Sequence, residues 1–244
     1  MNKTDIEQIR QITLALYDEP IALVNGSEYL CNHPYTHTIY IHYPPAVDRL
    51  DLSNSSDKAY YRREIAESLS KASVALCYAY IQTAFKLTWF KKCSPYLSDR
   101  LYAKYLKSAW LDEFNPNMDA NVSRQEVIEY FRKAKKGYIM DKDERQHFDN
   151  LSDTITIYRG VSPHREKYGL SWTDNKNIAL EYMKKFATEG EQGILLRATI
   201  SKNHVLCYIN TLKECELIVD VFAIMDKIEP YQGRNMNNIK EIEC

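Results

Sequence analysis

The spacing of apolar residues changes near residue 150, and this change constrains the fold of the chain more than any other feature. Before it, apolar side chains recur at steps of three and four residues, which is the period of an amphipathic helix. After it, short alternating or continuous apolar runs dominate, as in β-strands. Strands around one helix, without regular βαβ repetition, favour an α+β fold of two packed sheets. We therefore predict a mostly helical region over residues 1–150 and a strand-rich region over residues 151–244.

Local signals place the elements of both regions. Ser123 and Glu126 form a capping-box pattern that predicts the start of a helix, which Gly137 ends. Residues 36–43 alternate and predict a strand before Pro44-Pro45. Further helices are expected over residues 5–17, 57–90, 97–114, 141–151 and 175–187. Strands of the second region are expected over residues 154–158, 170–172, 193–201, 204–209, 214–221 and 222–228.

Composition limits the classes of function. The chain has 244 residues and a formal net charge of −1, so no overall positive field favours nucleic-acid binding. Its nineteen tyrosines are expected to serve mainly in packing, with stacking on bases as the alternative. The six cysteines show no Cys-x-x-Cys spacing and predict reduced, buried thiols of a cytoplasmic protein. The polar first ten residues predict no signal peptide, and no apolar run is long enough to cross a bilayer.

Metal and nucleotide-loop chemistry have little support in the sequence. Cys31, His33, His37 and His42 are close together, but their spacing fits no common zinc pattern. An alternating strand would also divide them between its two faces. No Gly-x-Gly-x-x-Gly or Gly-x-x-x-x-Gly-Lys-Ser/Thr motif occurs, which argues against a Rossmann or P-loop site. We therefore predict no metal site.

Three short motifs in the second region carry the strongest functional signal. Arg159 lies at the end of one apolar run, Ser171 and Thr173 lie on a second, and Glu214 and Glu216 lie on a third. Strands that carry these groups can meet in one cleft. Such a cleft would combine a cation, hydroxyl groups and carboxylates, which are the groups needed to hold a pyrophosphate and a sugar.

Each of these residue types suits the cleavage of a glycosidic bond to ribose. A guanidinium binds phosphate oxygens through two parallel hydrogen bonds, which suits Arg159, and Gly160 would let the backbone approach a ligand closely. Ser171 can donate and accept, so it can hold a carboxylate and a ribose hydroxyl in register. An ionised Glu216 would stabilise the oxocarbenium-like transition state. Glu214, one pleat repeat earlier, would share its strand face and act as general base for the acceptor.

These motifs resemble those of the mono-ADP-ribosyltransferases of the Arg–Ser–Glu type. Arg159 resembles the arginine of the family's first strand, Ser171 the first serine of its Ser-Thr-Ser motif, and Glu216 its catalytic glutamate, with Glu214 two residues before. The chain departs from the family in having Ser-Trp-Thr, in which Thr173 keeps the later hydroxyl. The stretch with its helical lead-in also looks like the phage- and toxin-associated branch of the family.

The resemblance implies an ADP-ribosyltransferase-like pair of packed sheets over residues 151–244, with NAD as substrate. It implies that Arg159, Gly160, Ser171 and Thr173 contact NAD and that the catalytic residues are Glu216, Glu214, Arg159 and Ser171. Tyr182 is a candidate to stack on nicotinamide, with packing inside the protein as the alternative. The acceptor is protein arginine or a nucleic acid such as RNA. The biological setting is an intracellular toxin of a toxin–antitoxin or phage-defence system, with an antitoxin as partner.

Other interpretations of the same residues remain open. The chain is alternatively an NAD glycohydrolase, or an inactive protein that binds NAD or another partner. Arg159 is alternatively a surface-strand arginine, and Ser171 and Thr173 a turn with a helix cap. Glu214 and Glu216 are alternatively the solvated face of an amphipathic strand.

Overall fold

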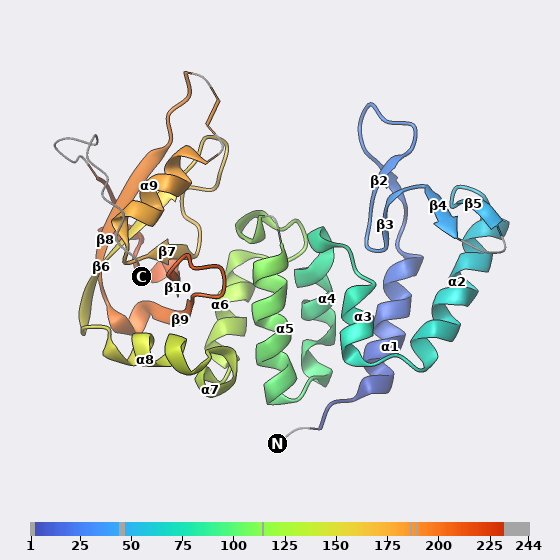
Figure 1. The fold of residues 1–244 in the computed structure, drawn as a ribbon, viewed down its shortest axis with the longest axis horizontal. Coiled ribbons are helices and arrows are strands. Elements are labelled where there is room, and N and C mark those ends of the chain that lie inside the picture. Colours follow the sequence, from blue (N-terminus) through green and yellow to red (C-terminus); the bar gives the residue numbers. More distant parts are fainter. Residues whose placement is uncertain (1–2, 44–46, 114, 186, 189, 232–244) are drawn as a thin grey trace. The chain divides into compact units, whose positions relative to one another are not determined.

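The structure is a computed structural model that describes residues 3–43, 47–113, 115–185, 187–188 and 190–231 (Figure 1). It contains two compact units, Met1–Val122 and Ser123–Cys244. The change from helix to strand occurs near residue 150, as the apolar spacing indicates, between α8 (Lys142–Asn150) and β6 (Thr154–Val161). The division between the units lies earlier in the chain, so the helices that directly precede the strands belong to the same unit as the sheet.

Helices form most of the first unit. They are α1 (Ile6–Ala15), α2 (Ser55–Ser70), α3 (Val74–Ala79), α4 (Lys86–Cys93) and α5 (Asp99–Asp112), with 3-10 turns at Leu16–Asp18, Thr83–Phe85, Ser94–Tyr96 and Pro116–Met118. The single helix predicted over residues 57–90 is therefore wrong. Ser73 interrupts it, because its side chain accepts a hydrogen bond from the Leu76 N–H and so caps a new helix.

Two small antiparallel sheets accompany these helices. One contains β1 (Ala22–Leu23), β2 (Leu30–His33) and β3 (Thr36–Thr38), and the other contains β4 (Tyr40–Tyr43) and β5 (Val47–Asp51). The strand predicted over residues 36–43 is divided between the two sheets at Ile39, which is buried. The backbone of Ile39 instead pairs with Tyr29 and Leu52. Pro44-Pro45 lies outside the described residues.

Aromatic side chains fill the core of the first unit. The indole N–H of Trp89 donates to the Thr13 hydroxyl at 2.9 Å, and the rings of Tyr78 and Tyr105 pack edge-on or tilted against each other and against Trp89. Further buried tyrosines are Tyr17, Tyr35 and Tyr102. These contacts agree with the packing role expected for many of the tyrosines. They also place Cys31 and His33 in a packed environment, where the His33 ring bonds the Tyr17 carbonyl and the Tyr35 N–H.

The second unit combines four described helices with a six-stranded antiparallel sheet. The helices are α6 (Arg124–Lys133), α7 (Lys136–Ile139), α8 (Lys142–Asn150) and α9 (Lys176–Lys184). The strands are β6, β7 (Ser171–Thr173), β8 (Ile194–Ser201), β9 (Val205–Ile209), β10 (Glu216–Val219) and β11 (Glu229–Pro230). The capping box at Ser123 and Glu126 is confirmed, but α6 ends at Lys133, before Gly137.

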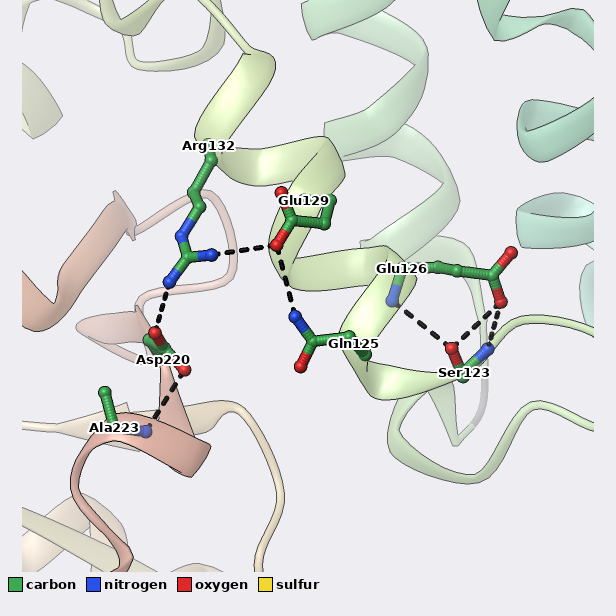
Figure 2. A network of polar contacts seen from close by, with 7 residues as sticks. All are labelled: Ser123, Gln125, Glu126, Glu129, Arg132, Asp220 and Ala223. Atoms are coloured by element: carbon green, nitrogen blue, oxygen red, sulfur yellow. Dashed lines mark hydrogen bonds and ion pairs between the residues drawn. The ribbon is translucent and has the colours of Figure 1, made fainter.

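The strand predicted over residues 222–228 is wrong. The chain forms two 3-10 turns there, Val221–Ala223 and Met225–Lys227. Asp220 starts the first turn, because its carboxylate accepts from the Ala223 N–H. The same carboxylate binds Arg132 of α6, which also donates to Glu129, so this network fastens α6 to the end of β10 (Figure 2).

The strand order of the sheet is β11-β8-β6-β7-β10-β9. Between β6 and β7 the register contains one pair, Tyr158 with Thr173, whereas β6 and β8 pair along their whole length from Thr154 to Val161. The sheet thus consists of two three-stranded halves joined at one point. Helix α9 covers β6, where Tyr158 packs against its buried side chains.

The predicted state of the cysteines is correct for four of them and wrong for one. Cys31, Cys77, Cys93 and Cys207 are free and buried. Cys215 is disulfide-bonded, which sequence spacing did not indicate because a disulfide depends on thiols that approach only in the folded chain. Cys244 and the polar stretch 233–238 lie outside the described residues. None of the helices in the described part of the chain has the length and apolar character that a membrane span requires.

Candidate functional site

The three sequence motifs lie on the three neighbouring strands β6, β7 and β10. Thr173 pairs with Tyr158 on one side and with Glu216 on the other. Residues directly opposite each other on antiparallel strands project to the same face of a sheet. Glu216 therefore projects to the face on which Tyr158 packs against α9. The fold brings together motifs that are far apart in the sequence.

Arg159 is held by backbone carbonyl groups. Its Nη1 donates to the carbonyl of Ser171 at 2.7 Å and its Nη2 to that of Glu166 at 2.8 Å. Its Nε is buried and has no hydrogen-bond partner among the described residues. Burial lowers the pKa of Arg159 to about 10, while the carboxylates of Glu216 and Glu166 act to raise it. The guanidinium is thus charged at neutral pH and enclosed, unlike a surface-strand arginine.

Glu216 is the first residue of β10 and is 8% exposed. This burial does not fit the solvated strand face that was the alternative for this residue. The carboxylate is close enough to act electrostatically on both Arg159 and Tyr182. A buried carboxylate within electrostatic range of a buried guanidinium is a type of arrangement that occurs at functional sites.

Glu214 reaches the site by a different route from the predicted one. It precedes β10, and the residues on both sides of it have left-handed backbone conformations, with φ values of +58° at Lys213 and +46° at Cys215. The prediction that Glu214 and Glu216 share one strand face by regular pleating is therefore wrong. The side chain of Glu214 instead forms a hydrogen bond with Tyr182 of α9. Burial, and then the Glu214 and Glu216 carboxylates, raise the pKa of the Tyr182 phenol.

The two hydroxyl residues of β7 have different neighbours. Thr173 is the one directly opposite Glu216, whereas Ser171 pairs with Ile218. The Thr173 hydroxyl accepts from the Asn175 N–H at 3.1 Å, so it also forms the turn that leads into α9. Ser171 contributes its carbonyl oxygen to Arg159. The interpretation of Thr173 as part of a turn before a helix thus accounts for its contact with Asn175. The pairing of β7 with β10 also places Thr173 beside the buried Glu216.

Gly160 is required for the packing of α9 on β6. A Cβ at this position would lie 1.8 Å from the Ala179 carbonyl oxygen and 2.5 Å from the Met183 nitrogen. Both atoms belong to the backbone of α9, which cannot move aside as a flexible side chain can. Gly160 therefore allows α9 to pack closely on β6, and its expected close approach to a ligand stays a prediction.

Sequence reasoning missed two residues beside Arg159. Arg124, the first residue of α6, has its Nη1 3.1 Å from Oε1 of Glu166. It also donates a hydrogen bond to the carbonyl of Tyr168. Glu166 lies in the loop between β6 and β7, where neither periodicity nor a motif singles it out. The one sequence feature that could have identified Glu166 is its position between two motifs of the candidate site.

A second polar cluster was also missed. His147 of α8 has its Nε2 3.0 Å from Oδ2 of Asp174, and its ring stacks on Tyr208 at a centroid distance of 4.0 Å. Two grooves of about 430 and 500 Å³ are both lined by His147 and Asp174. In the described part of the chain, no group of three or more His, Cys, Asp or Glu side chains is arranged to hold a metal ion.

Comparison with known proteins does not assign a function, so the proposal below is based on the geometry of the site. No protein-family model, no curated protein and no solved structure matches the chain.

Proposed function

We propose that the second unit is a mono-ADP-ribosyltransferase that uses NAD as the donor of ADP-ribose. The observation that carries this proposal is the meeting of Arg159, Glu216 and the Tyr182–Glu214 pair at adjacent strands and the covering helix. The sheet that divides into halves at Tyr158 and Thr173 supports an ADP-ribosyltransferase-like arrangement of this unit.

In this proposal the groups have separate roles along the NAD molecule. Arg159 binds the phosphate oxygens, to which its unsatisfied Nε can donate. Glu216 stabilises the positive charge that develops on the ribose as the bond to nicotinamide breaks. Thr173, directly across from Glu216, and Ser171 help to hold the carboxylate and the ribose hydroxyl. Tyr182 contributes its ring to the nicotinamide side of the site.

The acceptor is a macromolecule in the cytoplasm. In the family that the motifs resemble, a Glu-x-Glu motif accompanies arginine acceptors, so the resemblance of Glu214 and Glu216 to it favours protein arginine, and a nucleic acid such as RNA is the alternative. We propose a toxin whose activity an antitoxin protein restrains, in a toxin–antitoxin or phage-defence setting.

A second candidate function is NAD hydrolysis, in which water is the acceptor. It is favoured by the hydrogen bond between Glu214 and Tyr182, which occupies the carboxylate expected to activate a macromolecular nucleophile. An inactive protein that binds NAD remains the third interpretation. The burial of Glu216 argues against it, because a buried carboxylate is costly and the binding of NAD without cleavage does not require one.

The test is incubation of the protein with NAD labelled in the adenosine part, in the presence of cell lysate. Release of nicotinamide reports cleavage of NAD. Label that stays bound to the macromolecules of the lysate after washing reports transfer of ADP-ribose. Digestion by protease or by nuclease then identifies the class of acceptor. Absence of nicotinamide release, under conditions in which NAD binds, would contradict both the transferase and the hydrolase.

A further inference from the structure

Two arginines from different elements converge on the loop between β6 and β7. Arg124 of α6 contacts the carboxylate of Glu166 at 3.1 Å, and Arg159 of β6 contacts the backbone carbonyl of the same residue at 2.8 Å. Arg124 also donates to Tyr168, whose own N–H donates to Glu166 Oε1 at 2.9 Å. The Glu166 side chain is therefore the acceptor at the centre of this cluster.

The charges of the cluster fit a larger anion than one carboxylate. The guanidinium groups of Arg124 and Arg159 are close enough for Arg124 to lower the pKa of Arg159 by repulsion. Within the loop, the Glu166 carboxylate alone opposes these two charges, and the Glu216 carboxylate acts on Arg159 from β10. A diphosphate diester carries two negative charges and several acceptor oxygens, and two planar guanidinium groups can bind it with paired hydrogen bonds.

One hydrogen-bond donor in the cluster lacks an acceptor. Nε of Arg159 is buried and has no partner among the described residues. A buried donor without a partner destabilises the protein, because it has given up its hydrogen bonds to water without replacement. The carbonyls of Ser171 and Glu166 accept from Nη1 and Nη2 and leave Nε without an acceptor. An oxygen of a bound anion would accept the hydrogen bond from Nε.

We propose that Arg124 and Arg159 together form the site for the diphosphate of the dinucleotide, and that the Glu166 carboxylate occupies part of this site while the ligand is absent. This inference rests on the proposed use of NAD, but it concerns residues outside the motifs. Binding of the diphosphate then displaces the carboxylate of Glu166 from Arg124. Glu166 is accordingly a competitor of the ligand, and the loop that carries it changes its contacts when the site fills.

A purely structural role of the same contacts makes the opposite prediction for Glu166. If the contact between Arg124 and Glu166 only fastened the loop to α6, its loss would disorder the site and weaken binding. If Glu166 competes with the ligand, its neutral isostere must strengthen binding. The sign of one change in affinity therefore distinguishes the two roles.

The experiment is calorimetric titration of the full chain with ADP, which carries the diphosphate, and with adenosine, which lacks it. We expect Arg124→Gln to weaken ADP binding by about 10- to 100-fold, the range of a lost hydrogen bond to a charged group. We expect Glu166→Gln to strengthen ADP binding several-fold. Neither variant should change adenosine binding. Arg132→Gln is the matched control, because it removes an arginine of the same helix whose partners are Glu129 and Asp220.

Several outcomes would overturn the inference. They are wild-type affinity for ADP in Arg124→Gln, unchanged or weaker ADP binding in Glu166→Gln, and equal losses in the Arg132→Gln control. The absence of ADP binding by the wild-type protein would also overturn it. Thermal unfolding of each variant shows whether a loss of binding reflects a loss of folding. A wild-type protein that binds ADP through these arginines but releases no nicotinamide would contradict the proposed function alone.

Discussion

Glu216 is buried and acts electrostatically on the Arg159 guanidinium. The proposed cleavage depends on the negative charge of its carboxylate. We expect Glu216→Gln, which keeps the volume and removes the charge, to lower nicotinamide release and ADP-ribose transfer by about 100-fold or more. Affinity for NAD should change little, because the charge acts mainly in the transition state. Release assays and calorimetry on the same preparation measure both quantities.

The control for this change is Glu229→Gln. Glu229 lies on β11, where its carboxylate is exposed and paired with Arg197. Release of nicotinamide by Glu216→Gln at the rate of this control would remove Glu216 from the mechanism.

Substitutions at Tyr182 and Glu214 can distinguish the cleavage of NAD from the transfer of ADP-ribose. If Glu214 orients or deprotonates the acceptor, Glu214→Gln should lose most transfer and keep much of its NAD hydrolysis, because water needs little positioning. Tyr182→Phe removes the phenol that occupies the Glu214 carboxylate and should shift the ratio of transfer to hydrolysis in the opposite direction, toward transfer. The measurement pairs incorporated ADP-ribose with free nicotinamide. Parallel loss of both activities in Glu214→Gln would show that Glu214 serves NAD or the fold.

At the scale of elements, the packing of α9 on β6 depends on one missing side chain. Gly160→Ala should destabilise the second unit by about 1–3 kcal/mol, because the added Cβ meets the backbone of α9 and the helix must move. Displacement of α9 would also move Tyr182 and reduce activity. Denaturant unfolding monitored by tryptophan fluorescence, to which Trp172 of this unit contributes together with Trp89 and Trp110 of the first unit, measures the change.

Gly137→Ala provides the matched comparison. At this position the nearest atom to an added Cβ is the flexible end of Arg145 at 3.1 Å, and the residue lies within α7. Alanine is the better helix former, so we expect a small effect or a slight stabilisation. If both alanine variants unfolded at the same denaturant concentration as the wild type, the tight approach of α9 to β6 would be wrong.

At the scale of the whole molecule, stability is expected to depend on pH through the first unit. Burial, and then repulsion by the Asp119 carboxylate, raise the pKa of Glu113 from 4.5 to about 7. Its Oε2 is buried without a hydrogen-bond partner among the described residues. The folded state therefore binds more protons than the unfolded state between these two values. The free energy of unfolding should fall as pH rises from about 4.5 to about 7 and then level off.

Glu113→Gln tests this dependence. At pH 8 we expect the variant to be more stable than the wild type by about 1–2 kcal/mol, less than the full shift in pKa implies, because the side chain is partly exposed. At pH 4.5 the two proteins should be similar. Urea unfolding at both pH values measures the difference, with Glu28→Gln, an exposed acid of the same unit, as control. Equal stability of Glu113→Gln and wild type at pH 8 would contradict the buried charge.

Local chemistry by itself determined much of the secondary structure. The capping box of Ser123 and Glu126 involves groups three residues apart, so the start of α6 follows from the sequence. The change from helices to strands near residue 150 follows from apolar spacing in the same way. The order of the three motifs was also visible, because it depends on residue type alone.

Only the tertiary structure decided how these parts meet. The pairing of Thr173 with both Tyr158 and Glu216 joins segments separated by long stretches of chain, and spacing along the sequence does not encode which strands become neighbours. The left-handed conformation at Cys215 places Glu214 outside the strand, where its side chain forms a hydrogen bond with Tyr182. In the same way, the contact of Arg124 with Glu166 exists because α6 and the loop after β6 approach each other in the folded unit. Such contacts depend on the packing of the whole unit, whereas helix caps and apolar periods depend on near neighbours in the chain.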